Sequence, residues 1–100
     1  MDDQLFWDVA EVFLERGADR STMMGYPCLR RNGKFFASFD RQTGDLVAKL
    51  PKDRVDELID SDVGAPFVPA GRRFKEWVVV EERDFDLWQR LFEEAYEFVE

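Results

Sequence analysis

Residues 30–50, RRNGKFFASFDRQTGDLVAKL, decide the fold because they predict consecutive antiparallel strands. The dipeptide Asn32-Gly33 is typical of a two-residue β-hairpin turn, in which both residues take positive φ. It separates a strand at about 27–31 from a second strand at about 34–40. The segment RQTG at 41–44 then predicts a four-residue turn into a third strand at about 45–50.

The lengths of these two turns predict which side chains share a face of the sheet. The expected cross-strand pairs are Arg31–Lys34, Arg30–Phe35, Cys28–Ala37, Phe39–Leu46, Ala37–Ala48 and Phe35–Leu50. One face is then almost entirely apolar and is the expected core face, with Cys28, Phe35, Ala37, Phe39, Leu46, Ala48 and Leu50. The opposite face mixes cations with apolar groups: Arg31, Lys34, Phe36, Ser38, Val47, Lys49 and Leu29.

Hydrophobic periodicity predicts helices on both sides of these strands. Residues 3–16 carry an apolar stripe of Leu5, Phe6, Val9, Val12 and Phe13, and the last helix, capped by Asp84, carries Trp88, Leu91, Phe92, Ala95 and Val99. Pro51 suits the first turn of a short helix that ends near Ser61, and FKEWVVVE at 74–81 predicts a further strand. The order α-β-β-β-α-β-α indicates one α+β domain over residues 1–100, with helices packed on an antiparallel sheet. We expect one core that contains Phe35, Phe39, Leu46, Trp77, Trp88 and Phe92.

Charge and cysteine content limit the classes of function. The 100 residues carry a formal net charge of −8, yet residues 16–54 hold nine basic and four acidic side chains. The overall charge opposes general affinity for nucleic acid or anionic membranes, because phosphate binding needs a local basic field. Cys28 is the only cysteine, so no internal disulfide can form, and we expect a cytoplasmic protein. The longest apolar run, WVVV, is far too short to span a membrane.

Several short motifs occur in an order that resembles a known superfamily. They are MMGYP at 23–27, with Met24 where phenylalanine is usual, GKFFA at 33–37, LVAKL at 46–50, KEWVVV at 75–80 and AYEFV at 95–99, with Ala95 where serine is usual. Together they resemble the MmcQ/YjbR superfamily and its relative, the TfoX N-terminal domain. The resemblance covers about residues 20–100 and implies the "double-wing" α+β domain of a bacterial-type protein.

The same resemblance implies a functional expectation. Members of this superfamily are often described as DNA-binding, and the TfoX family is tied to the regulation of natural competence. The superfamily brings no catalytic signature. The expectation is therefore a small non-enzymatic domain that is either a weak DNA-binding or regulatory module, or a protein-interaction domain or homodimer.

The candidate contacts for nucleic acid or a partner come from the mixed face of the predicted hairpins. Cations there would meet phosphates while an aromatic ring stacks on a base. The set is Arg31, Lys34, Phe36 and Lys49, extended by Arg72 and Arg73 in the loop before the last strand. The alternative is a solvated sheet face, on which the stems of lysine and arginine cover apolar neighbours while their charged ends stay in water.

A second apolar strip lies on the first predicted helix. Trp7 and Leu14 are seven residues apart and so lie almost above one another, with Ala10 between them. This strip is a candidate surface for self-association or for a partner protein, because clustered exposed apolar groups often mark such sites. The alternative is a helix wedged between the sheet and the last helix, which would bury both strips.

Catalysis is not expected from these residue types. The chain has no histidine, which is the commonest general base and metal ligand. Cys28 has no histidine to activate it and no second cysteine with which to bind zinc, so we expect a buried structural thiol. The sequence therefore predicts no catalytic residues, no metal site and no cofactor.

Overall fold

The hairpin expected at Asn32-Gly33 forms, and both turn residues take positive φ, 51° at Asn32 and 81° at Gly33. This turn joins strand β2 (Tyr26–Arg31) to strand β3 (Lys34–Asp40), and a second turn leads from β3 into β4 (Asp45–Lys49). The two turns predicted from the sequence thus join β2, β3 and β4 into one continuous antiparallel meander.

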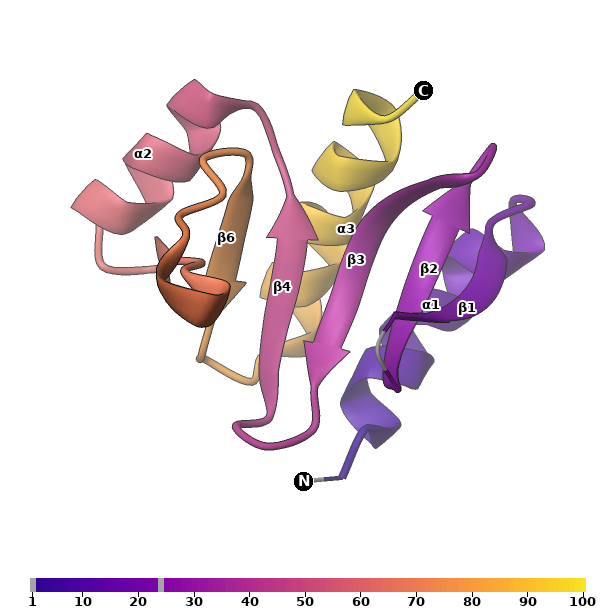
Figure 1. Cartoon of the computed structure of the whole chain (residues 1–100). Helices are drawn as coiled ribbons and strands as arrows, with labels where there is room; N and C mark the ends of the chain where they lie inside the picture. Colours follow the sequence, from indigo (N-terminus) through magenta and orange to yellow (C-terminus); the bar gives the residue numbers. More distant parts are fainter. Residues whose placement is uncertain (1, 24) are drawn as a thin grey trace.

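The computed structural model of the protein describes residues 2–23 and 25–100 (Figure 1). Met24, the position at which the resembling motif has phenylalanine, lies outside the described residues. The remaining elements are α1 (Gln4–Glu15), β1 (Asp19–Met23), α2 (Lys52–Asp60), β5 (Ala65–Pro66), the short 3₁₀ helix η1 (Pro69–Gly71), β6 (Trp77–Val80) and α3 (Phe85–Phe98). The chain therefore has the expected α+β architecture.

The sheet has the strand order β1-β2-β3-β4-β6-β5, and every neighbouring pair is antiparallel. Figure 1 shows α1 and α3 on one side of the sheet, α2 at the end of the sheet where β6 lies, and the segment with η1 on the opposite side. No helix of eight or more residues among those described covers this opposite side, which we call the open face.

Two strands were not expected from the sequence, β1 and β5. The segment Asp19–Met23 is mostly polar, so it lacks the apolar alternation by which strands are recognised. It pairs only with β2. Ala65–Pro66 is only two residues long, and its proline suits a sheet edge because proline has no amide hydrogen to donate. Both are edge strands, and their pairing depends on the neighbouring strand more than on their own sequence.

A β-bulge between β2 and β3 corrects the predicted faces of the hairpin. Leu29 lies opposite Ala37 while Arg30 lies opposite Phe35, so Phe36 is an extra residue on β3. Phe36 and Ala37 are both fully buried in the core cluster, whereas Phe35 is only half-buried. The expectation that Phe35 belongs to the core face and Phe36 to the outer face was wrong.

The bulge also moves Cys28. This residue lies opposite Ser38 and not opposite Ala37, and so it belongs to the open face together with Val47. It is nevertheless fully buried as a free thiol, as expected. Beyond the bulge the predicted pairs Phe39–Leu46 and Ala37–Ala48 are confirmed, while the described pairing of β3 with β4 does not reach Phe35 and Leu50.

An aromatic cluster forms the centre of the core between the sheet and the helices. Phe36 lies within ring-stacking distance of Phe13, Phe92 and Tyr96, and Phe39 lies against Phe6 and Trp88. Aromatic pairs at these separations add to the free energy gained by burying their surface. Of the six residues expected in one core, Phe39, Leu46, Trp88 and Phe92 are buried there; Trp77, like Phe35, is only half-buried and lies on the open face.

The helices pack largely as their periodicity predicts. Asp84 caps α3 by accepting a hydrogen bond from the Leu87 amide at 3.0 Å. Helix α1 is rotated slightly from the expected orientation, since Val12 is 37% exposed and Ala10 is fully buried in its place. Ion pairs at 2.6 Å and 2.8 Å tie Arg16, at the end of α1, and Arg54 of α2 to neighbouring glutamates of α3.

Candidate binding groove on the open face

The candidate basic contacts do not form one surface. Arg31 lies on the helix side, where its guanidinium stacks 3.9 Å from the Tyr96 ring and donates to the Tyr96 carbonyl at 2.8 Å. Phe36 is buried in the core and cannot stack on a base. The bulge explains both differences. It shifts the pairing of β2 with β3 by one residue, so the side chains at the hairpin end lie on the face opposite to the one predicted.

The other cations of this set are spread over the surface. Lys34 is exposed beside the hairpin turn, and Lys49 is half-buried on β4. Arg72 and Arg73 are exposed, and Arg73 lies 3.7 Å from Asp56 of α2. Of the predicted set, Lys49 and Arg72 each contact an aromatic ring that borders the groove described below.

The candidate strip on α1 is partly covered by the chain itself. Trp7 and Leu14 are half-buried and pack against the core, and Ala10 is fully buried. The indole nitrogen of Trp7 donates to Asp3 at 2.9 Å, and the guanidinium of Arg20 lies 4.2 Å from its ring. Both the polar atom and one face of this tryptophan are therefore engaged within the molecule.

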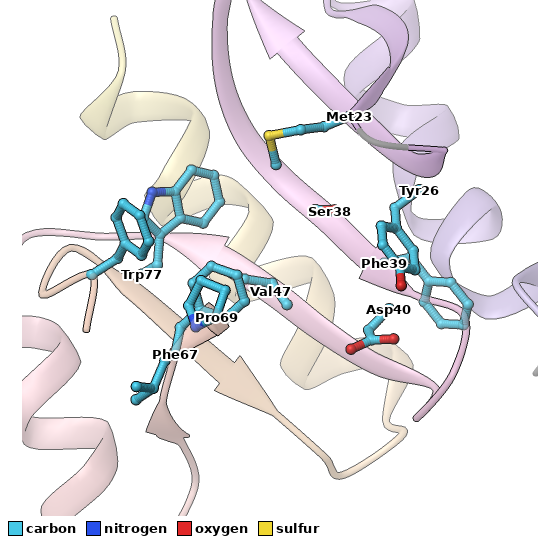
Figure 2. Close-up of a pocket in the computed structure, with 11 residues that line it drawn as sticks. Met23, Tyr26, Ser38, Phe39, Asp40, Val47, Phe67, Pro69 and Trp77 are labelled. Carbon is cyan, nitrogen blue, oxygen red and sulfur yellow. The ribbon is translucent and has the colours of Figure 1, made fainter. Parts of the chain in front are cut away.

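A groove of about 520 Å³ lies on the open face (Figure 2). Figure 2 shows Trp77, Phe67 and Pro69 on one side of it and Tyr26 and Asp40 on the other, with Met23 reaching toward it from above. The residues that line it, among those the structure describes, are Met23, Tyr26, Ser38, Phe39, Asp40, Val47, Phe67, Val68, Pro69, Phe74 and Trp77. Most of these side chains are apolar or aromatic, and none of them belongs to the candidate set predicted from the sequence.

One wall of the groove is a loop folded onto the open face. The Phe74 amide donates to the Phe67 carbonyl at 3.0 Å and thereby closes the loop that holds η1. The Phe67 ring lies 6.0 Å from the Phe74 ring and 6.4 Å from the Trp77 ring. Because this aromatic cluster fixes the loop against β6, the wall is formed without a ligand.

The floor and the far wall come from the strands. Ser38 and Val47, which face each other across β3 and β4, are buried beneath the groove. The hydroxyl of Ser38 donates to the Pro27 carbonyl at 3.2 Å, so its proton is already used within the protein. Met23 and Tyr26 pair at the end of the β1–β2 hairpin and raise the opposite wall.

The two ends of the groove lie beside side chains of opposite charge. Asp40 lines one end and lies directly opposite Asp45 across the β3–β4 pair. Toward the other end, the Lys49 ammonium lies 5.8 Å from the Trp77 ring, and the Arg72 guanidinium lies 5.3 Å from the Phe74 ring. The groove is therefore acidic at one end, apolar in the middle and basic beside its aromatic end.

The groove does not offer an evident reactive group. Cys28 lies under the open face, and burial raises the pKa of its thiol, which disfavours the reactive thiolate. Within the described ranges no cluster of three or more cysteine, aspartate or glutamate side chains is arranged to hold a metal ion. The helices of residues 2–23 and 25–100 include none with the length and apolarity needed to cross a membrane.

Sequence reasoning missed this site for an identifiable reason. The signal available was a cluster of three aromatic residues, Phe67, Phe74 and Trp77, around a segment rich in proline and glycine. Such a segment predicts a loop, but the sequence does not show that the loop folds back over the sheet.

Comparison with known proteins identifies no relative of this chain. No family model matches the chain, and neither a curated protein nor a solved structure matches it.

Proposed function

We propose that this protein is a non-enzymatic binding domain that takes an apolar molecule into the groove of its open face. The observation that carries this proposal is the groove itself, with a volume of about 520 Å³ and a lining of apolar and aromatic side chains. Pockets that bind small molecules have volumes of roughly 300–1,000 Å³ and are lined mainly by such side chains, with a few polar groups that orient the ligand.

The polar groups of the groove support binding better than catalysis. The Ser38 hydroxyl donates its proton to the Pro27 carbonyl and not to a side-chain base. An oxygen of Asp40 accepts a hydrogen bond from the Gln42 amide at 2.9 Å, as in an ordinary turn. Catalysis of acyl or proton transfer requires a nucleophile or acid next to a positioned partner. These two groups are better suited to orienting a ligand.

A titration with the neutral probe 4-phenylbutan-1-ol tests this proposal. We expect binding of about millimolar affinity, as is usual for a ligand with so few atoms. The indole NH signal of Trp77 in ¹⁵N–¹H NMR spectra should shift, while those of Trp7 and Trp88, which lie outside the groove, serve as internal references. Shifts confined to Trp7 and Trp88, or no binding at ten millimolar probe, would refute the proposed function.

A filled groove provides the matched control for that titration. Met23→Trp places a large ring in the groove from an edge strand, and we expect it to weaken binding of the probe at least about tenfold. Val12→Trp adds the same ring to the exposed face of α1 and should leave the affinity unchanged. Equal affinities for both variants would show that the probe binds elsewhere.

Single-stranded DNA is a second candidate ligand, in keeping with the role that the MmcQ/YjbR resemblance implies. The observation in its favour is that Lys49 and Arg72 lie against Trp77 and Phe74 on the groove side. Cations next to accessible aromatic rings are the combination with which proteins hold unpaired nucleotides. Membership of that superfamily and a cytoplasmic location, which suits a chain with a single cysteine, remain part of this proposal.

Fluorescence anisotropy with a labelled oligonucleotide tests this second candidate. If it is correct, binding should be detected at about 50 mM salt and fall steeply as salt rises, because bound counterions are released. Lys49→Ala with Arg72→Ala should then abolish it, whereas Lys52→Ala with Arg90→Ala removes the same charge from exposed positions of α2 and α3 and should not. Equal losses in the two double variants would indicate a non-specific charge effect.

A further inference from the structure

We infer that the ligand of the groove is a small planar aromatic molecule that stacks on the rings of both walls, and not an alkyl or acyl chain of similar size. This inference rests on the proposed function and adds the chemical class of the ligand. It means that the groove distinguishes an aromatic ring from the corresponding saturated ring.

The first argument is that both walls of the groove carry aromatic rings. Tyr26 belongs to one wall, and Phe67, Phe74 and Trp77 belong to the other. Figure 2 shows Tyr26 on the opposite side of the groove from Trp77 and Phe67. Aromatic rings in offset or edge-to-face contact are more stable than the burial of their area alone predicts. A ligand gains this additional stability at both walls only if it is itself aromatic.

The second argument is that the Tyr26 ring has no partner of this kind within the protein. The side chain is half-buried, yet among residues 2–23 and 25–100 no ring or cation stacks on it and its hydroxyl makes no hydrogen bond. The Trp77 ring, by contrast, has the Phe67 ring at 6.4 Å and the Lys49 ammonium at 5.8 Å. An aromatic ligand supplies a ring contact to Tyr26, whereas an alkyl chain supplies only apolar surface.

The third argument is the rigidity of the walls. The Phe67 ring is inclined by 39° to the Phe74 ring and by 52° to the Trp77 ring, so contacts within the protein already set the orientation of this cluster. Tyrosine and tryptophan offer a large contact area at a low cost in side-chain entropy. A planar ring has no internal rotations to lose on binding, whereas an alkyl chain does. Rigid aromatic walls therefore favour a rigid aromatic ligand.

The fourth argument is the floor between the walls. Ser38 and Val47 are both buried there, and the Ser38 hydroxyl is engaged with the Pro27 carbonyl. A polar chain laid over this floor would give up hydrogen bonds to water without replacing them by one to this hydroxyl, which is costly. The apolar edge of an aromatic ring has no such bonds to lose.

The experiment compares two alcohols with one skeleton, 4-phenylbutan-1-ol and 4-cyclohexylbutan-1-ol. The saturated ring has the larger apolar surface, so burial of area alone predicts that the cyclohexyl compound binds at least as tightly. NMR titration of the intact protein should instead give an affinity for the phenyl compound about fivefold higher, as expected for added ring contacts. The phenyl protons of the bound probe should also shift upfield, because they lie over aromatic faces.

Variants of Tyr26 separate stacking from shape. Tyr26→Leu keeps an apolar side chain and removes the ring, and we expect it to lower the preference for the phenyl compound to about twofold. Tyr26→Phe keeps the ring and should retain the full preference. Phe85→Leu removes an exposed ring of α3 outside the groove and should also retain it. An unchanged preference in a folded Tyr26→Leu variant would overturn the inference that the ligand stacks on both walls.

The possible failures are distinguishable, and the comparison of the two alcohols on the wild type does not depend on any variant. Equal affinities, or tighter binding of the cyclohexyl compound, would overturn this inference and leave the proposed function standing. Tighter binding of adenosine than of 4-phenylbutan-1-ol would also overturn it and would favour single-stranded DNA. Failure of both alcohols to bind would refute the proposed function and, with it, the inference.

Discussion

Phe36→Ala should destabilise the protein by about 3–5 kcal/mol, whereas Phe35→Ala should cost less than about 1 kcal/mol. Phe36 is fully buried and contacts Phe13, Phe92 and Tyr96, so its removal leaves a large cavity between the sheet and two helices. Phe35 is half-buried, and its ring lies 5.4 Å from the Arg30 guanidinium on the open face. Urea denaturation of the two variants measures both values.

This pair of variants is a test of the β-bulge as well as of the core. Without the bulge, strict alternation from Ala37 would place Phe35 in the core and Phe36 outside it, and the two costs would be exchanged. The two substitutions are chemically identical and lie at adjacent positions, so propensity and unfolded-state effects largely cancel. A larger cost for Phe35→Ala would contradict the described register of β2 and β3.

Gly64→Ala should destabilise the protein by about 1–3 kcal/mol, the usual cost of overpacking a well-packed site. A β-carbon at this position would lie 2.5 Å from Val78 Cγ2 and 3.2 Å from Leu58 Cβ, closer than packed carbon atoms approach. Gly64 lies where the end of α2 meets β6, and its amide donates to the Leu58 carbonyl at 2.9 Å. For a domain of this size, each kcal/mol should lower the midpoint of thermal unfolding by roughly 4–8 °C.

The control for this prediction is a double-mutant cycle with Val78→Ala. That substitution removes the methyl group that the new β-carbon would meet. The combined variant should therefore cost at least about 0.5 kcal/mol less than the sum of the single variants. Strict additivity would show that the cost of Gly64→Ala arises elsewhere, for example in the backbone.

Much of the fold follows from local sequence signals. The turn at Asn32-Gly33, the cap at Asp84 and the apolar stripe of α3 are each set by residues close together in the chain, and the structure confirms them. The pairing Phe39–Leu46 was also predicted correctly, because turn length fixes the register on that side of the hairpin. These signals sufficed for the α+β class.

The remaining features depend on packing between distant segments. Phe35 and Phe36 are the same residue type, so no local preference indicates which of them enters the core. The bulge that decides this places Phe36 against α1 and α3, which lie far from it in the sequence. The same bulge removed Arg31 and Phe36 from the predicted basic surface. A shift of one residue in the pairing of β2 with β3 thus altered the predicted set of site residues and left the predicted fold class unchanged.

The groove could not be derived from sequence for a related reason. It requires the loop around η1 to fold over the open face and the β1–β2 hairpin to rise on the other side. Strand β1 has no apolar alternation, and the loop carries only general turn signals. The sequence shows the aromatic residues that line the groove, but it does not show that they lie together in the folded protein.

We expect an apolar probe to bind in the groove of the open face. Intermolecular nuclear Overhauser effects between the phenyl protons of 4-phenylbutan-1-ol and the labelled protein measure this directly. We predict contacts from the probe to the Val47 methyl groups and to the Tyr26, Phe67 and Trp77 rings. Contacts only to residues of the helix side, such as Val12 or Phe98, would contradict the assignment of the open face as the binding surface.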